Sequence, residues 1–343
     1  MPTYAYGGQA LMEGVLMRGR DALAVALRHP DGRIVTATER LDSGMHASPV
    51  ARWPFVRGLV VLYETLVVGT RWLIRSANVQ AEEDDVELGK GTIVVTLLIT
   101  FGVAIAVFSL LPLFISSVAT SGATQGWAQP ALEGLIQVGI FLGYLTLVSR
   151  TPDIHRVFQY HGAEHMTIHA LEAGDPLTVD EVRKYPTAHH RCGTEFLVIL
   201  VLLSIFAFSL VGKQEPLVMI GSRFVLIPVL AAVGYEILKF GARFRSNPLI
   251  KVIMYPGILV QMITTKRPTD DMIEVAITSM QEALTADGNT VPDGSTLFER
   301  NALELPADKR ARADVAAATT TDTPHDPIDP VPAASPGEPP PLT

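Results

Sequence analysis

The sequence predicts a mainly α-helical integral membrane protein with about four transmembrane helices and a small N-terminal cytoplasmic segment that contains a β-hairpin. Three observations predict this fold class: 42 residues from Gly91 to Leu132 without a charged side chain, further apolar stretches after them, and a charged fraction of only 18%. Soluble domains carry roughly 25% charged residues, and their core helices are much shorter than this run. A purely cytosolic globular enzyme is therefore not expected.

Residues 1–90 are predicted to form a cytoplasmic or membrane-surface segment. Two short apolar stretches, Ala22–Leu27 and Ile34–Thr38, flank the turn sequence Pro30-Asp31-Gly32. Apolar stretches joined by a turn of this composition are typical of a β-hairpin.

A helical pattern extends from Trp53 to Arg75. Its charged residues share one stripe at about 100° per residue, and they are Arg57, Glu64, Arg71 and Arg75. An amphipathic helix at the membrane interface and a helix packed in a protein core both fit this pattern. The acidic run Glu82–Glu87 that follows is predicted to be solvated.

Residues 91–240 are predicted to form a four-span membrane domain with a cytoplasmic His-rich loop at 150–195. The predicted spans are Thr92–Ser116, Ala131–Ser149, Phe196–Val211 and Leu217–Leu238. The third span is short, because about 20 apolar residues normally cross a bilayer. In the fourth, Arg223 and Glu236 lie near opposite ends, where long side chains can reach the interface.

The distribution of Lys and Arg predicts the orientation of these spans. The segment Ala119–Pro130 has no basic residue, whereas the 150–195 loop, the N-terminal segment and the residues after span four hold many. Basic residues favour the cytoplasmic side. Both termini and the 150–195 loop are therefore expected in the cytoplasm.

Residues 241–300 are predicted to contain an interfacial or re-entrant segment, Leu249–Thr264, interrupted by Pro256-Gly257, and a cytoplasmic helix from Thr269 to about Leu284. Residues 301–343 are rich in Pro, Ala and Thr and should be disordered. The formal charge of −8 belongs to the C-terminal part, since residues 270–343 carry 14 acidic and 4 basic side chains. No basic-aromatic stripe is present, so nucleic acid is not an expected partner.

The strongest chemical motif is His161-Gly162-Ala163-Glu164-His165, in a region where six of the nine histidines lie. Two histidines four residues apart on a helix point the same way and can chelate one divalent metal ion, zinc above all. The intervening Glu164 is placed to act as a general base, in the H-x-x-E-H order of some zinc peptidases. Histidines that pack inside the protein with satisfied hydrogen bonds would give the same pattern without a metal.

A catalytic zinc site needs a third protein ligand and one position for water. His189 and Cys192, just before the third predicted span, are the candidates, and Arg191 would favour the thiolate of Cys192. Cys192 could instead act as a nucleophile with His189, and Glu172 could orient a ligating imidazole. His169 is expected to be a packed or exposed histidine. Because Cys192 is the single cysteine, an intramolecular disulfide is excluded.

These motifs resemble the central signatures of the YqhQ-like family of uncharacterised bacterial membrane proteins, which are predicted metal-dependent enzymes. The resemblance covers roughly residues 5–285 and rests on Tyr160–His165, His189–Thr194, Gly7–Val15, Met17–Gly19, Gly234–Glu236, Pro256-Gly257 and Thr264–Pro268. It implies a multi-pass protein of the bacterial inner (cytoplasmic) membrane and a metal-dependent activity without a known reaction.

The chain departs from the family pattern at three positions. Met166 stands where the family has Lys, His190 where it has Pro, and Glu195 where it has Ser. The first change leaves the ligand set intact, and the other two add residues that could ligate a metal. Glu13 is a further carboxylate, expected to pair with Arg18 or to cap the backbone.

Three functions are compatible with the sequence. The first is a zinc-dependent hydrolase at the cytoplasmic membrane face, with His161 and His165 on the metal, Glu164 as base, and a peptide or lipid-linked substrate. The second is a non-catalytic assembly or scaffold factor for membrane protein partners, with a structural metal or none. A carrier or channel is less favoured, because its spans should pair charges near the middle of the bilayer.

Overall fold

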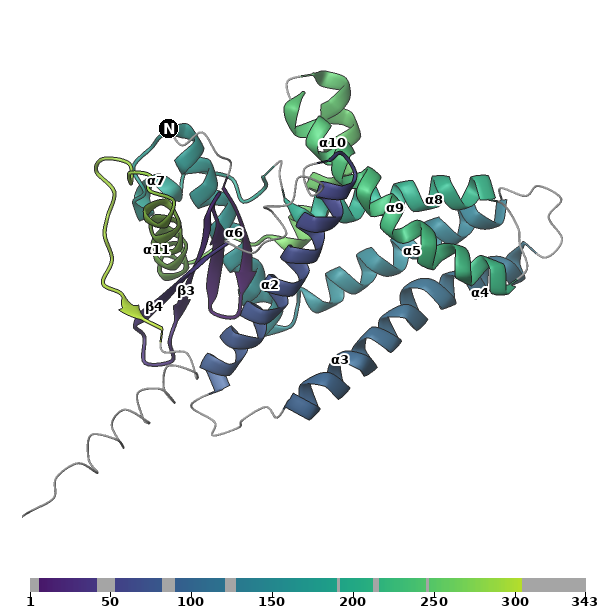
Figure 1. The fold of residues 1–343 in the computed structure, drawn as a ribbon, viewed down its shortest axis with the longest axis horizontal. Helices are drawn as coiled ribbons and strands as arrows, with labels where there is room; N and C mark the ends of the chain where they lie inside the picture. Colours follow the sequence, from purple (N-terminus) through teal and green to yellow (C-terminus); the bar gives the residue numbers. More distant parts are fainter. Residues whose placement is uncertain are drawn as a thin grey trace, which may run out of the picture. The chain divides into compact units, whose positions relative to one another are not determined.

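Helices make up most of the chain, and one small sheet accompanies them (Figure 1). The structure is a computed structural model that describes residues 6–41, 53–81, 90–120, 128–189, 192–211, 216–244 and 247–303. By its contacts the chain divides into residues Met1–Ala302 and Leu303–Thr343, and the helices and strands that the structure describes lie in the first unit. The acidic run Glu82–Glu87 lies outside the described residues. Of the tail 301–343 that was expected to be disordered, Asn301–Ala302 form a short strand, and the residues after Leu303 lie outside the described part.

The sheet has five strands in the order β1-β2-β3-β4-β5. Its first four strands are antiparallel neighbours, and the last runs parallel to β4; they are β1 (Gly7–Leu11), β2 (Gly14–Arg18), β3 (Ala22–Arg28), β4 (Ile34–Arg40) and β5 (Asn301–Ala302). The predicted hairpin is confirmed as β3 and β4. Strands β1 and β2 were not predicted, because glycines at positions 7, 8 and 14 obscure the alternation of apolar residues that marks a strand. Strand β5 has two residues, too few to show an alternation.

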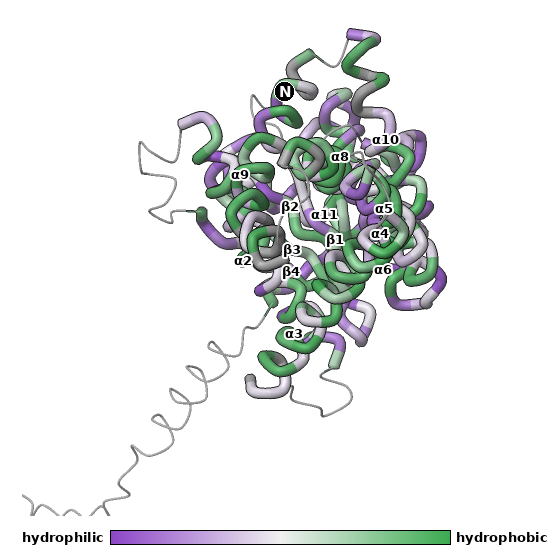
Figure 2. The backbone as a smooth tube through the Cα atoms, turned by 90° about the vertical axis from the view of Figure 1, so that its right-hand side faces the viewer, coloured by the Kyte–Doolittle hydropathy of each residue, from purple (hydrophilic) through white to green (hydrophobic). Residues whose placement is uncertain are grey.

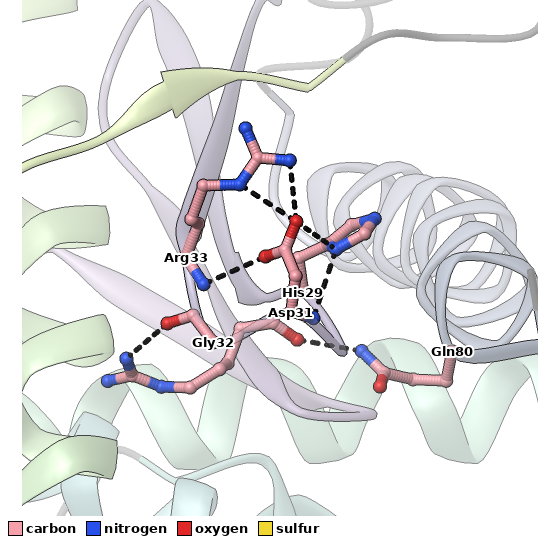
Figure 3. A network of polar contacts seen from close by, with 6 residues as sticks. His29, Asp31, Gly32, Arg33 and Gln80 are labelled. Carbon is pink, nitrogen blue, oxygen red and sulfur yellow. Dashed lines mark hydrogen bonds and ion pairs between the residues drawn. The ribbon is translucent and has the colours of Figure 1, made fainter. Parts of the chain in front are cut away.

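The turn between β3 and β4 is held by local polar contacts and by one helix (Figure 3). Gly32 has φ of +89°, a conformation that glycine adopts without steric cost. The Asp31 carboxylate accepts hydrogen bonds from the Arg33 guanidinium, and these bonds lower the pKa of Asp31. Gln80 donates from its side chain to the carbonyl of Arg28 at 2.8 Å, so helix α2 (Val56–Ala81) grips the end of this hairpin.

Two helices cover one face of the sheet. They are α6 (Pro152–Ala173) and α11 (Asp270–Ala286), and they form a buried core with side chains of β2 and β3. The buried Ser279 hydroxyl lies 3.0 and 3.1 Å from two strand carbonyls, those of Val15 and Ala24, and so pins α11 to the sheet. The predicted helix after Thr269 is confirmed, with Asp270 and Asp271 in its first turn.

Helix α2 has a packed side and an exposed apolar side. Trp72 and Ser76 are buried, and the backbone N–H of Met12 donates to the hydroxyl of Ser76. Tyr63 and Leu66 are 55% and 59% exposed on the same helix. The helix therefore combines both features that the sequence left open, a core contact and an apolar surface.

The apolar middle of the chain forms long helices. They are α3 (Lys90–Ile105), η3 (Ala106–Leu110), α4 (Leu111–Ala119), α5 (Ala128–Val148), α8 (Gly193–Val211) and α9 (Pro216–Arg243). Helix α4 contacts α5, α5 contacts α8, and α8 contacts α9 (Figure 1). Figure 2 shows that α3 and α8 are hydrophobic along most of their length.

Within the described ranges, two helical segments are long and apolar enough to cross a membrane, Val94–Ala119 and Ala128–Val148. They correspond to the first two predicted spans. The predicted third and fourth spans form α8 and α9, whose passage through a bilayer stays a prediction.

Two short sequence motifs give different outcomes in the C-terminal half. The sequence Thr178 to Glu181 caps the start of α7 (Val179–Val182), where the Thr178 hydroxyl accepts a hydrogen bond from the backbone N–H of Glu181. The break expected at Pro256-Gly257 is absent, because α10 (Pro248–Thr264) is a continuous helix. A single proline removes one backbone hydrogen bond, and the rest of the helix tolerates that loss.

Candidate metal centre

Helix α6 carries the H-x-x-E-H motif and has well-defined ends. Thr151 precedes it in an extended conformation, Pro152 occupies the first turn, and Gly174 ends it with φ of +81°. Proline at the start and glycine just past the end are the usual arrangement for a helix. The helix is buried along its middle, so the histidines at positions 161 and 165 lie on one face inside the protein.

The two histidines are held by backbone carbonyls from different segments. The Nδ1 atom of His161 lies 2.8 Å from the carbonyl oxygen of Thr264, and Nδ1 of His165 lies 2.6 Å from that of Thr187. A carbonyl oxygen only accepts, so Nδ1 of each ring is the donor, and in a neutral imidazole Nε2 then has the lone pair. Metal-ligating histidines commonly show this arrangement, with one ring nitrogen fixed and the other free to coordinate.

Cys192 completes a group of three candidate ligands. Its Sγ atom lies 3.2 Å from Nε2 of His161, and the ligand atoms of His161, His165 and Cys192 all lie within 4.8 Å of one another. Zinc binds nitrogen at about 2.0 Å and sulfur at about 2.3 Å, so ligand atoms around it are roughly 3–4 Å apart. The three residues therefore fit a divalent metal ion after a small inward movement.

Burial shifts the pKa values of His165 and Cys192. Burial lowers the pKa of His165, which keeps its imidazole neutral. Burial raises the pKa of the Cys192 thiol, and the N–H and hydroxyl of Thr194 oppose that effect. A bound divalent cation would reverse the balance for the thiol, since coordination deprotonates it. Arg191, expected to favour the thiolate, lies outside the described residues, as does His190.

Glu164 directly precedes His165, so its side chain projects from α6 about 100° around the helix axis from that of His165. It is 4% exposed. Burial raises its pKa to about 8, with His161 acting in the opposite direction. Its carboxylate accepts a hydrogen bond from the backbone N–H of Gly8 on β1. A Cβ atom at position 8 would lie 2.9 Å from Cγ of Glu164, so glycine is required for this close approach.

The structure places His189 beside the group of three, with a different set of contacts. Its ring centroid is 5.7 Å from that of His165 and 4.5 Å from that of His169. Its Nε2 lies 3.6 Å from the carboxylate of Glu172. Glu172 is thus close to an imidazole, as expected for an orienting residue, and that imidazole belongs to His189. His169 also stacks on the ring of Tyr185.

Gln261 of α10 holds the backbone of His189 in place. Its side chain accepts from the His189 N–H at 2.8 Å and donates to the His189 carbonyl at 2.9 Å, and it is completely buried. Glu195, the departure from the family pattern, is buried nearby, with Oε1 at 3.5 Å from the Gln261 amide. These contacts fix the segment that carries both candidate third ligands.

Glu13 forms an ion pair, but with Arg156 of α6 and not with Arg18. Nε and Nη2 of the Arg156 guanidinium donate to the carboxylate at 2.5 and 2.6 Å, and the Tyr160 hydroxyl donates to it at 3.2 Å. Glu13 has φ of +52°, the left-handed conformation, at the β1–β2 turn. The pair attaches the N-terminal sheet to the helix that carries the histidines.

A cavity of about 810 Å³ adjoins the candidate metal centre. Its wall includes His161, His165, Glu164 and Cys192 at one side, together with residues of β1, α2, α5, α8 and α9. The candidate ligands and the candidate base therefore face the same space.

Sequence reasoning missed the residues that position the ligands. The carbonyls of Thr187 and Thr264 have no sequence signature, since every residue has a carbonyl. Gln261 lies in an apolar stretch, where a single buried amide could have indicated a polar contact.

Comparisons with known proteins place the chain among proteins without an assigned role. The family described as "Protein of unknown function (DUF1385)" matches residues 53–286. The chain is 33% identical over 293 residues to "Uncharacterized protein YqhQ" of Bacillus subtilis (strain 168), covering 82% of this chain and 92% of that protein. No solved structure matches the chain. The extent of both matches shows that the chain belongs to this uncharacterised, YqhQ-like family.

Proposed function

We propose that the chain is a metal-dependent hydrolase of the bacterial cytoplasmic membrane, with its active site at the cytoplasmic face. His161, His165 and Cys192 would hold one divalent metal ion, zinc by preference. The observation that carries the proposal is the arrangement of the two imidazoles. Both are fixed through Nδ1 on backbone carbonyls, and Nε2 of His161 faces the single thiol of the chain.

The surroundings of the three residues support hydrolysis more than a purely structural role. Structural zinc has four protein ligands, whereas catalytic zinc has three and an open position. Among the residues that the structure describes, the group brought together within 4.8 Å has three members, and it adjoins a cavity. When bound, the metal would lower the pKa of a water molecule to near 7.

Glu164 would act as the general base in this site. Its carboxylate lines the same cavity as His161 and Cys192. It would take a proton from the attacking water as the oxygen of that water bonds to the substrate carbonyl carbon, and it would return the proton to the leaving group when the carbonyl–heteroatom bond breaks. Glu164 now bonds the Gly8 N–H, so the reaction requires this contact to open or to be shared.

Four membrane crossings with both termini in the cytoplasm belong to the same proposal. Support comes from α3–α4 and α5, which have the length and apolarity of spans, and from α8, which is apolar from Phe196 onward. Exposed apolar side chains on α10, including Leu249, Val252 and Met262 at 65–69% exposure, suit a helix at the membrane interface.

The first test is the metal content of detergent-purified protein by elemental mass spectrometry. We expect about one equivalent of metal in the wild type, as for a single zinc site, and a loss in His161→Ala and in His165→Ala. His155→Ala is the matched control, because His155 lies on the same helix outside the group of three. Absence of metal after chelator-free purification, with all variants equally stable, would overturn the proposal.

Cys192 offers a second readout, because it is the single cysteine. Alkylation by iodoacetamide should be slow in the metal-loaded protein and should accelerate after chelation. Equal rates in both states would contradict thiolate ligation. Cobalt substitution then separates the two classes of site: a spectrum that shifts with acetohydroxamate indicates an open position, and an unchanged spectrum favours the scaffold function.

A further inference from the structure

The cavity beside the candidate metal centre has a predominantly apolar wall away from the ligands. That wall comes from three helices of the apolar part of the chain and from α2, and it includes Val61, Leu62 and Val68 of α2, Phe196 and Leu197 of α8, and Leu238 of α9. Its volume of about 810 Å³ lies in the upper part of the range of about 300–1,000 Å³ for small-molecule sites. The space is larger than a single carbonyl group and a water molecule require.

Charge is sparse in this wall. Among the lining residues that the structure describes, the acidic and basic side chains besides the three histidines are Arg18 and Glu164, and Glu164 belongs to the candidate catalytic group. A peptide would bring unpaired backbone N–H and C=O groups into this apolar space, and each would need a partner. A hydrocarbon chain needs none.

The edge strand β1 is the element that could supply such partners to a peptide. Its residues Gly7 to Ala10 line the cavity, and β1 is the outer strand of the sheet. Addition of an extended peptide to a sheet edge depends on free outward-facing backbone groups. The N–H of Gly8 is already bonded to Glu164, so this backbone donor of β1 is not free for a peptide.

The apolar wall also reaches the outer surface of the protein. Leu197 lines the cavity and remains 43% exposed on α8. Helix α8 is uncharged after Glu195, and its outward side chains Leu202 and Phe206 are 49% and 63% exposed. A hydrocarbon chain could therefore pass from this helix surface into the cavity without crossing a polar layer.

We propose that the substrate of this site is a lipid whose hydrocarbon chain occupies the cavity between α2, α8 and α9, with its hydrolysable carbonyl group at His161 and Cys192. This inference rests on the proposed hydrolase function and names its substrate class. Hydrolysis would add one water across an ester, giving a carboxylic acid and an alcohol. The chain binds by burial of apolar surface, and the metal centre acts on the polar group.

The test is photolabelling in nanodiscs of phosphatidylethanolamine and phosphatidylglycerol. The probe is a phosphatidylethanolamine with a diazirine in its acyl chain, and adducts are located by peptide mass spectrometry. We expect adducts on the cavity-lining residues Val61, Leu62 and Val68 of α2 and on Leu238 of α9. Adducts confined to the outer surfaces of α3, α4 and α5 would overturn the inference.

Filling the cavity supplies the matched comparison. Val68→Trp should abolish the cavity adducts, because Val68 lines the cavity, whereas Val67→Trp should keep them, because Val67 is 48% exposed on the outside of the same helix. Leu238→Trp fills the cavity from α9 and should also abolish the adducts. It repeats the test independently in case Val68→Trp does not fold. Thermal unfolding of each variant reports its folding, and equal labelling in all three would contradict the proposal.

Two further arms separate the inference from the function on which it rests. His161→Ala should lose the metal and keep the cavity adducts. If the wild type gives cavity adducts but contains no metal, the hydrolase proposal is refuted, while binding of a hydrocarbon chain in the cavity stands. If it contains metal but gives no cavity adducts, only the lipid substrate is refuted. Loss of adducts upon addition of an unlabelled extended peptide would indicate a peptide substrate and overturn the inference.

Discussion

At the level of single residues, the contacts of Nδ1 decide which ring nitrogen of His161 and His165 is the hydrogen-bond donor. The carbonyls of Thr264 and Thr187 fix the proton of each ring on Nδ1. Both carbonyls belong to segments far from α6 in sequence. The ligand geometry therefore depends on the position of those segments as much as on the histidines.

Glu164 allows a test that separates its chemistry from its structural contact. Glu164→Gln keeps an oxygen to accept from the Gly8 N–H and removes the carboxylate that burial disfavours, since burial raises its pKa to about 8. We expect the metal-free variant at neutral pH to unfold at the wild-type temperature or higher, because no charge has to be buried.

Glu164→Ala leaves the Gly8 N–H without an acceptor and opens space, and should lower the free energy of unfolding by about 1–3 kcal/mol. Thermal unfolding in detergent at pH 7 compares the variants. Both should retain the metal, because Glu164 is outside the group of three ligands. If Glu164→Gln were as unstable as Glu164→Ala, the contact with Gly8 would not be the structural role of this residue.

At the level of elements, α6 and the segment after α10 approach each other at a glycine. A Cβ atom at position 162 would lie 2.1 Å from the carbonyl oxygen of Lys266, and the N–H of Lys266 bonds the carbonyl of Phe158 at 2.8 Å. Thr264, whose carbonyl holds His161, lies two residues before Lys266. The packing of two elements thus sets a contact of the candidate metal centre.

Gly162→Ala tests this coupling. Alanine favours a helix over glycine by about 1 kcal/mol, so propensity alone predicts a more stable protein. We expect instead a lower unfolding temperature and a weaker metal affinity, by about tenfold or more, because the Lys266 segment must move and shift the Thr264 carbonyl. Competition with a metal chelator measures the affinity.

Gly139→Ala is the control for this substitution, since a Cβ atom there meets nothing within 4 Å on α5. It should leave the metal affinity unchanged. Unchanged affinity in Gly162→Ala as well would show that the close approach at Lys266 does not determine the position of the ligand.

At the level of the whole molecule, membrane topology provides the test. Basic residues flank the predicted cytoplasmic segments, and the Ala119–Pro130 segment has none. We expect alkaline phosphatase fused after Gly122 to be active and the same enzyme fused after Gly174 to be inactive, because it folds only outside the cytoplasm. A green fluorescent protein at the C-terminus should be fluorescent.

An active phosphatase after Gly174 would contradict the proposed orientation, because that position follows the α6 helix of the candidate metal centre. A further fusion after Lys213 tests the proposed crossings of α8 and α9, which the length and apolar composition of these helices do not establish. Activity there is expected if α8 crosses the membrane, and inactivity would leave α3–α4 and α5 as the only pair of spans in the described part of the chain.

The sequence by itself determined the local features. The spacing of four residues puts His161 and His165 on one face of α6, because the α-helix has 3.6 residues per turn. The turn Pro30-Asp31-Gly32 determined the β3–β4 hairpin, and Thr269 with the acids after it marked the start of α11. Each of these depends on interactions within a few residues of the chain.

Tertiary structure alone decided the rest. The sequence left His189 and Cys192 as equal candidates, and the fold brought the thiol within 3.2 Å of His161 while His189 came to face Glu172. It likewise paired Glu13 with Arg156 in place of Arg18. These choices depend on contacts between distant segments, such as Gln261 on the His189 backbone, and no local pattern encodes the distance between them.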